Sequence, residues 1–177
     1  MSPVTAQRTL MLLRHAKAEQ AQGKLDHARE LAPRGRRDAR AVGLWLADPS
    51  QGMVLDLVLC STSERTRQTL DGLRAGGASV TETLFDDRIY NGGASSLLDV
   101  LREVSDSVSA VLMIGHGPGI PMLATALAQE GVGSTEAIEH LSSGFPTCGL
   151  AILAFHGRWA TLAPEAASLR DFAVPRG

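Results

Sequence analysis

Two histidines and two arginines in this sequence stand just after short apolar runs, and their types suit the handling of a phosphoryl group. Arg14-His15 follows TLMLL, Arg65 lies in STSER after VLDLVLC, and His116 lies in GHG after AVLMI. The planar guanidinium group of arginine matches phosphoryl oxygens and keeps its charge. A histidine beside the phosphorus can act as a nucleophile, which divides a difficult displacement into two easier steps. The four residues together indicate phosphoryl-transfer chemistry.

The arginines also predict the protonation state of His15. Nearby cations disfavour a charged imidazole, so they keep its nucleophilic nitrogen unprotonated, and they stabilise the negative charge of the transition state. We therefore predict that the pKa of His15 lies below its ordinary value of about 6.5. Backbone N–H groups at the helix starts after Ser61 and Gly117 add a field that favours an anion.

The elements that must position these groups alternate between short apolar runs and longer stretches of helical periodicity, which is typical of an α/β fold with a mainly parallel sheet. Ligands of such sheets bind beyond the carboxyl ends of the strands, so the three motifs should converge on one crevice. We predict strands over residues 9–13, 54–60, 78–83 and 110–114, and a closing hairpin from residues 149–155 and 159–163.

Helix start signals separate these strands. Pro33 opens the first helix, and Ser61 with Glu64 forms a capping-box signature for the second. Ser95 or Ser96 is expected to cap a third helix, and residues 120–129 form a fourth. We predict one domain over residues 1–177, with residues 164–177 as a short helix or a flexible tail.

Composition excludes several functional classes. The net charge of −2 gives no broad surface for a nucleic-acid backbone, so any phosphate site must be local. No run approaches the roughly 20 apolar residues of a membrane span, and the first residues lack the pattern of a signal peptide. Cys60 and Cys148 lie in apolar stretches and form no C-x-x-C motif, which favours a reducing compartment. We expect a cytoplasmic protein.

The motifs together resemble the histidine phosphatase superfamily. LMLLRHAKAE is similar to its Arg-His-Gly signature, STSERTRQT to its S-x-x-x-R-[AT]-x-Q-T element, and IGHGPGI to its second-histidine motif. The short SixA-like phosphohistidine phosphatases resemble the chain most, because they often carry Arg-His-Ala and an acidic residue before Arg-x-Leu-Thr-x-x-Gly. Here that segment runs from Asp26 to Gly35, with Ala32 in place of threonine. The resemblance, from about Leu10 to Leu127, implies a three-layer α/β sandwich like that of phosphoglycerate mutase.

The resemblance also implies roles for the four residues. His15 would be the phosphoacceptor that forms a transient phosphohistidine. Arg14 and Arg65 would hold phosphoryl oxygens, and His116 would donate a hydrogen bond to the same group. No cofactor is implied. We expect no metal either, because zinc has no use for several arginines aimed at one point.

Further site residues are implied less directly. Arg29 would be an additional phosphate ligand, with Asp26 and Gly117 beside the substrate. Residues 86–90 (DDRIY) resemble the E-R-x-Y segment of larger relatives, so Asp87 would protonate the leaving oxygen. Asp26 is the alternative acid, and a phosphohistidine substrate, with its good nitrogen leaving group, would need no strong acid. His27 matches no motif and is interpreted as a surface or turn residue.

Three functions remain open at this point. The first is a phosphatase for a phosphorylated protein, or for a small phosphate ester. The second is a mutase that moves a phosphoryl group between hydroxyls, but it needs a closed site and the chain has no long insertion for a lid. The third is a phosphate-binding regulator without turnover, which would not need both histidines. The oligomeric state stays open.

Overall fold

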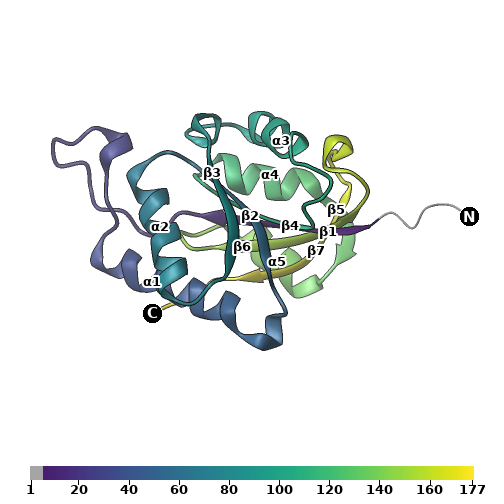
Figure 1. Cartoon of the computed structure of the whole chain (residues 1–177), viewed down its shortest axis with the longest axis horizontal. Coiled ribbons are helices and arrows are strands. Elements are labelled where there is room, and N and C mark those ends of the chain that lie inside the picture. Colours follow the sequence, from purple (N-terminus) through teal and green to yellow (C-terminus); the bar gives the residue numbers. More distant parts are fainter. Residues whose placement is uncertain (1–5) are drawn as a thin grey trace, which may run out of the picture.

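The apolar runs form the centre of a seven-stranded sheet in the computed structural model, which describes residues 6–177 (Figure 1). The strand order is β3-β2-β4-β1-β6-β7-β5, and β1, β2, β3 and β4 run parallel to their neighbours within that group. β6 pairs antiparallel with β1 and with β7. The strands are β1 (Gln7–Arg14), β2 (Leu55–Cys60), β3 (Val80–Phe85), β4 (Ala110–Gly115), β5 (Ala128–Gly133), β6 (Leu150–His156) and β7 (Ala167–Ala173).

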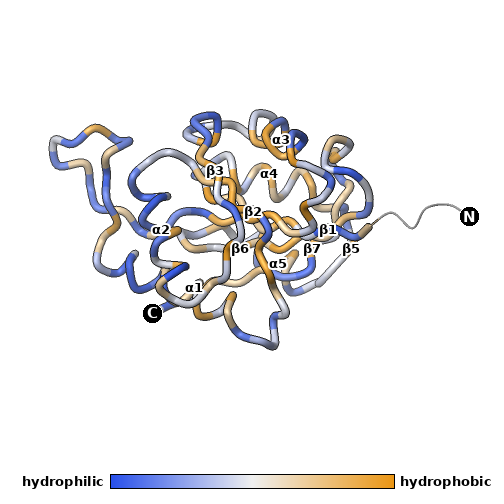
Figure 2. The backbone as a smooth tube through the Cα atoms, viewed as in Figure 1, coloured by the Kyte–Doolittle hydropathy of each residue, from blue (hydrophilic) through white to orange (hydrophobic). Residues whose placement is uncertain are grey.

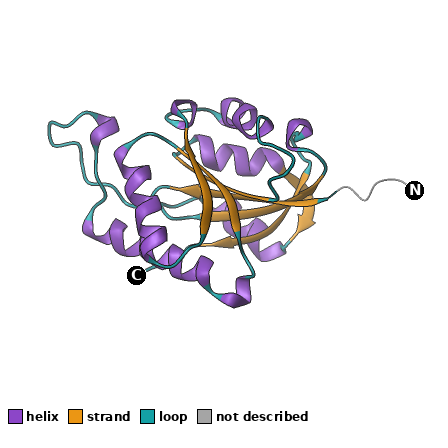
Figure 3. Cartoon of the chain, viewed as in Figure 1, coloured by secondary structure: helices purple, strands orange, loops and turns teal. Residues whose placement is uncertain are grey.

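Helices cover both faces of the sheet, so the predicted three-layer sandwich is confirmed (Figure 3). α1 and α2 pack against one face, and α3, α4 and α5 pack against the other. The helices are α1 (Pro33–Ala47), α2 (Glu64–Ala75), α3 (Ala94–Arg102), α4 (Gly119–Leu127) and α5 (Thr135–Ser143), and the short 3-10 helices are η1 (Asp26–Ala28), η2 (Pro49–Gln51), η3 (Asp87–Ile89) and η4 (Trp159–Thr161). No helix among residues 6–177 has the length and apolar character needed to cross a bilayer.

β1 shows why the central strands are apolar throughout. Met11 and Leu13 belong to the apolar cluster beneath α1 and α2, whereas Leu10 and Leu12 belong to the cluster beneath α3 and α4. Side chains alternate between the two faces of a strand, and here both faces are covered. Figure 2 shows the resulting hydrophobic centre of the sheet. Each buried leucine contributes about 1.5–3 kcal/mol to folding.

The predicted caps of two helices are wrong. α2 begins at Glu64, after Ser63, and the hydroxyl of Ser61 does not cap it. That hydroxyl instead lies 2.8 Å from His116 Nε2. α3 begins at Ala94, with Gly93 before it, so neither predicted serine caps that helix.

The C-terminal part of the chain differs most from prediction. Residues 159–163 do not form a strand, because Trp159 turns into the core and its Nε1 donates to the carbonyl of Val108 (2.8 Å). The partner of β6 is β7 (Ala167–Ala173), which lies in the predicted tail, so this part of the tail is a strand and not a helix. β5 and α5 were not predicted. β5 is a largely exposed edge strand without an apolar run.

Candidate active site

The four motif residues meet in one cavity of about 340 Å³ at the carboxyl ends of β1, β2 and β4. Parallel pairing places these ends together: the N–H of His15 donates to the carbonyl of Gly115 (3.0 Å), and the N–H of Ser61 donates to that of Ile114 (3.0 Å). The predicted convergence of the motifs is therefore confirmed. The cavity is lined by Arg14, His15, Lys17, Ala18, Asp26, Arg29, Arg65, Asn91, His116, Gly117 and Thr147.

His15 is held in one tautomer by its surroundings. Its Nδ1 donates to the carbonyl of Ala16 (2.7 Å), so the proton of a neutral ring resides on Nδ1. Its Nε2 then carries a lone pair, and it accepts a hydrogen bond from Nε of Arg65 (3.3 Å). The nitrogen that faces the cationic groups is therefore the unprotonated one.

The pKa of His15 is lowered to about 4, which confirms the direction that we predict from the sequence. Burial is the largest cause, because it disfavours the charged imidazolium. The positive charges of Arg65, Arg14 and Arg29 lower the pKa further, whereas the hydrogen bond to Ala16 opposes the shift. Burial of the ring thus outweighs the arginines on which the prediction rested.

Arg14 is fastened to the loop before β6. Its Nη1 donates to the carbonyl of Phe145 (2.8 Å), and its own carbonyl accepts from the N–H of Cys148 (3.0 Å). Its Nε is buried and has no hydrogen-bond partner among the described residues. Burial lowers the pKa of this guanidinium. Gly117 lies against the same group, since a Cβ atom there would be 3.4 Å from Nε of Arg14.

Arg65 reaches the cavity from the first turn of α2, and it is almost fully buried. Besides His15, it binds the residue at the start of η1: Nη1 donates to the backbone carbonyl of Asp26 (2.7 Å), and Nη2 donates to its carboxylate (3.1 Å). These contacts fix the plane of the guanidinium next to His15 Nε2. Arg67, two residues later, donates to the carbonyl of Thr62 instead and does not line the cavity.

The carboxylate of Asp26 accepts hydrogen bonds from three side chains. It accepts from Tyr90 Oη (2.7 Å), Arg29 Nη1 (3.0 Å) and Arg65 Nη2. The hydrogen bond from Tyr90, followed by that from Arg29, holds the pKa of Asp26 well below its ordinary value. Asp26 is consequently ionised at neutral pH, and it orients two arginines. An ionised carboxylate of this kind is poorly suited to donate a proton.

His116 lies beside His15, with 5.1 Å between the two ring centroids. Its Nε2 is bound to Ser61, and its Nδ1 is buried without a partner among the described residues. Burial, followed by the influence of His15, lowers its pKa to about 3, so the ring is neutral at neutral pH. A buried nitrogen without a partner is costly in a folded protein, which indicates that a ligand completes its hydrogen bonding.

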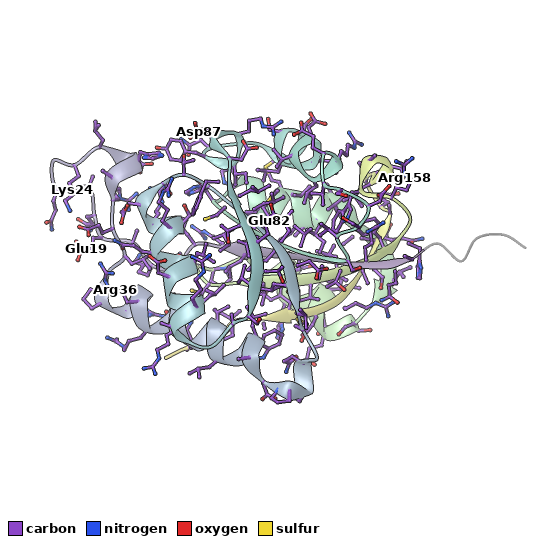
Figure 4. The ribbon with its side chains drawn as sticks, in the orientation of Figure 1. Glu19, Lys24, Arg36, Glu82, Asp87 and Arg158 are labelled. Atoms are coloured by element: carbon purple, nitrogen blue, oxygen red, sulfur yellow. The ribbon has the colours of Figure 1, made fainter. Side chains whose placement is uncertain are left out.

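Asp87 does not line the cavity. It is exposed at the start of η3, where its carboxylate accepts from Thr62 Oγ1 (2.6 Å) (Figure 4). The same threonine hydroxyl lies 3.0 Å from His27 Nε2, so His27 has a defined partner beside the cavity. The ring of His27 also packs edge-on against Tyr90. The segment that resembles E-R-x-Y therefore affects the site through Tyr90, which donates a hydrogen bond to the lining residue Asp26.

Four lining residues were not predicted: Lys17, Ala18, Asn91 and Thr147. Lys17 stands two positions after His15, and this proximity is a signal that could have identified it. Thr147 has no such signal, because it reaches the site only through the loop before β6. A larger cavity, of about 500 Å³, lies between α4, β5, α5 and β7, but it is mostly apolar and contains none of the motif residues.

The lining side chains make the cavity strongly cationic. Four of them carry a positive charge (Arg14, Lys17, Arg29 and Arg65) and one, Asp26, carries a negative charge, while both histidines are neutral. Among residues 6–177, no group of three or more histidine, cysteine or acidic residues is arranged to hold a metal ion. The arrangement suits a multiply charged anion beside an unprotonated imidazole nitrogen.

Known proteins resemble the chain over nearly its whole length. The model of a family described as "Histidine phosphatase superfamily (branch 1)" matches residues 10–89. An uncharacterized protein of Mycobacterium tuberculosis (strain H37Rv) is 37% identical over 164 residues, which cover 93% of this chain and 100% of the relative.

Solved structures show the same similarity. A candidate phosphohistidine phosphatase SixA from Nakamurella multipartitia is 36% identical, with a TM-score of 0.80 over 96% of this chain and 97% of that one. Another, from Agrobacterium tumefaciens, is 30% identical, with a TM-score of 0.74 over 95% of this chain and 99% of that one. Both matches extend beyond the family model's range, so they include the segment around His116.

Proposed function

The chain belongs to the histidine phosphatase superfamily, in its SixA-like subgroup, and is a phosphatase; from this premise we propose that it hydrolyses phosphohistidine in a partner protein through a phosphohistidine on His15. The observation that carries the proposal is the pair of hydrogen bonds on the His15 ring. Nδ1 donates to Ala16 and Nε2 accepts from Arg65, so a lone pair on Nε2 is available beside cationic groups.

Substrate binding would rearrange few contacts. A phosphoryl oxygen takes the hydrogen bond that Arg65 Nε now donates to His15, and this releases the lone pair of Nε2. Arg14 Nε, which has no partner among the described residues, binds a second oxygen. If the hydroxyl of Ser61 donates to His116 Nε2, the proton of that ring resides on Nδ1 and is donated to a third oxygen.

The reaction then proceeds in two displacements. His15 Nε2 forms a bond to phosphorus while the bond between phosphorus and the substrate imidazole breaks, and the departing nitrogen takes a proton from water. A water molecule next attacks the phosphorus of the phosphohistidine, the bond to His15 Nε2 breaks, and the proton that this water loses neutralises the hydroxide left by the first step. Inorganic phosphate leaves, and the neutral ring of His15 is restored. Arginines stabilise the charge of both transition states.

The scarcity of acids at the site favours a nitrogen leaving group. Among the residues that line the cavity, Asp26 is the one carboxyl group, and its hydrogen bonds with Tyr90 and the two arginines keep it ionised. Asp87 is outside the lining and bound to Thr62. An alkoxide leaving group depends on a proton donor, whereas the imidazole of phosphohistidine departs more readily. The exposed positions of Lys17, Asp26 and Asn91 leave room for a side chain of another protein.

The test is a comparison of substrates with a trapping step. The protein is incubated with a phosphohistidine peptide, a phosphoserine peptide and an aryl phosphate, quenched in base, and analysed for acid-labile phosphate on His15. We expect label on His15, phosphate release, and fastest turnover of the phosphohistidine peptide. His15→Ala should abolish both the label and turnover, whereas His140→Ala, at a histidine that does not line the cavity, should retain both.

Other outcomes would redirect the proposal. Preference for a small phosphate ester would support a metabolite phosphatase, and transfer to a second hydroxyl would support a mutase. Binding of phosphate without turnover would support a regulator. The cytoplasmic location stays a prediction; Cys60 and Cys148, on which it partly rests, are both buried and unpaired.

A further inference from the structure

We propose that Lys17 forms a second subsite at the mouth of the cavity, which binds a carboxylate next to the phosphoryl group and so favours phosphohistidine flanked by an acidic residue. This inference rests on the proposed function, because it concerns the substrate of the same site. It assigns a role to Lys17, which has no part in the reaction proposed above.

The charge balance of the cavity is the first argument. The lining carries four positive charges and one negative charge, a net charge of +3. A phosphoryl group carries a charge of about −2 at neutral pH, so one positive charge remains unmatched. A carboxylate would balance that charge, whereas a second phosphoryl group would exceed it. The observation therefore selects a carboxylate, which in a protein substrate is an aspartate or a glutamate.

The unmatched charge can be assigned to one residue. Arg29 and Arg65 both bind the carboxylate of Asp26, and Arg14, whose Nε has no partner among the described residues, is assigned above to the phosphoryl group. The ammonium group of Lys17 makes no hydrogen bond or ion pair with any residue of the described range 6–177. Three N–H donors are thus available at the exposed edge of the cavity, beside groups that are already engaged.

The backbone of Lys17 is held firmly, which gives the subsite a fixed origin. Its carbonyl accepts from the N–H of Ala32 (2.9 Å), and Ala18 forms a β-bridge with Leu31. Gly35 in the first turn of α1 touches the same carbonyl, since a Cβ atom there would lie 2.1 Å from it. A glycine is therefore required for α1 to approach Lys17 so closely. This contact accounts for the glycine of the Asp26–Gly35 segment.

Lys24 provides a matched control on the same connection between β1 and α1. Its ammonium group is paired with Glu30 Oε2 (2.7 Å), and it does not line the cavity. Figure 4 shows Lys24 on the protruding part of that connection, away from Asp87. Replacing Lys24 removes a positive charge of the same kind from the same segment, but outside the site.

The experiment measures kcat/KM for two matched pairs of substrates. One pair is phenyl phosphate and its carboxylated analogue, carboxyphenyl phosphate. The other pair is a phosphohistidine peptide with glutamate or with glutamine next to the phosphohistidine. For the wild-type protein we expect a preference of about threefold to fivefold for the carboxylated member, as for a single accessible ion pair. The preference should decline as the salt concentration rises.

The variants identify the residue. Lys17→Met should bring the preference close to one, while Lys24→Met should keep the wild-type preference. The ratio within a pair is the readout, because loss of Lys17 also weakens the attraction for every phosphoryl group. Turnover of phenyl phosphate by Lys17→Met shows that the variant is folded.

The outcomes separate this inference from the proposed function. If none of the four substrates is hydrolysed, the proposed function fails. If they are hydrolysed without a preference for the carboxylate, or if the preference persists in Lys17→Met, only the Lys17 subsite is overturned. If the small pair shows the preference and neither peptide is hydrolysed, the subsite holds and the protein substrate is wrong.

Discussion

The cavity has two regions that differ in burial, which we call the floor and the rim. The floor consists of His15, Arg65 and His116, at the ends of parallel strands, and the rim consists of Lys17, Asp26, Arg29 and Asn91. The Arg65–Asp26 ion pair joins the two regions, and its side chains are 6% and 50% exposed respectively. Solvent screens charges at the rim but much less at the floor. The same kind of charged group should therefore contribute more to catalysis at the floor than at the rim.

The two arginines that share Asp26 test this difference most strongly. Arg65→Lys should reduce kcat/KM about 10- to 100-fold, because a charge-assisted hydrogen bond at a buried site is worth about 1.5–3 kcal/mol. Arg29→Lys should reduce it about threefold or less, in line with an exposed ion pair. Both values are measured with an aryl phosphate. Equal losses for the two variants would show that burial does not separate the floor from the rim.

The floor also predicts how activity and stability depend on pH. His15 must be neutral to attack, and its pKa is about 4, so kcat/KM should fall about tenfold per pH unit only below that value. The measurement is kcat/KM against pH, corrected for the ionisation of the substrate. An NMR titration of His15, assigned with His15→Asn, checks the same pKa. A midpoint near the ordinary value of about 6.5 would contradict this account of the floor.

The same shift links pH to folding. The pKa of His15 is lower in the folded protein than in the unfolded chain, so the unfolded chain binds more protons in acid. This contribution to stability is fully present above about pH 6.5 and is lost as the pH falls toward about 4. Urea unfolding at neutral pH and at mildly acidic pH should show a smaller pH dependence for His15→Asn than for the wild-type protein. An equal dependence would argue against a neutral, buried ring.

Asp26 tests the link between rim and floor. Asp26→Asn keeps the shape of the side chain but removes the charge that orients Arg65 and Arg29. We expect kcat to fall about fivefold, because Arg65 is less well positioned. Inhibition by inorganic phosphate should be unchanged or stronger, because a negative charge has left the cavity. Weaker inhibition together with an unchanged kcat would contradict this positioning role.

Asp87 should show the smallest effect. Because it lies outside the cavity lining, we expect Asp87→Asn to change kcat/KM less than about twofold for a phosphohistidine peptide or an aryl phosphate, since surface substitutions have small effects. Glu82→Gln, at an exposed acid on β3, is the control (Figure 4). A large loss confined to an alkyl phosphate would instead identify Asp87 as the proton donor.

The sequence alone determined the floor of the site. His15, Arg65 and His116 each follow a strand that is buried on both faces, and such strands have a continuous apolar pattern that can be recognised locally. The carboxyl ends of parallel strands must lie at one edge of their sheet, so three local patterns were sufficient to predict one long-range convergence. The direction of the His15 pKa shift followed from the same reasoning.

Tertiary structure alone placed Lys17 and Asn91 at the rim, and it alone decided the hydrogen-bond partners of Asp26 and the far side of the sheet. β7 alternates irregularly between buried and exposed residues, and β5 is a largely exposed edge strand, so neither has a strong periodic pattern. The partners of Ser61 and Asp26 are likewise distant in the chain: His116 and Tyr90. A hydroxyl or a carboxylate can accept hydrogen bonds from many donors, and its local sequence does not specify which one the fold brings near. Such pairings depend on the assembled sheet, whereas a buried strand can be recognised from the apolar pattern of a few consecutive residues.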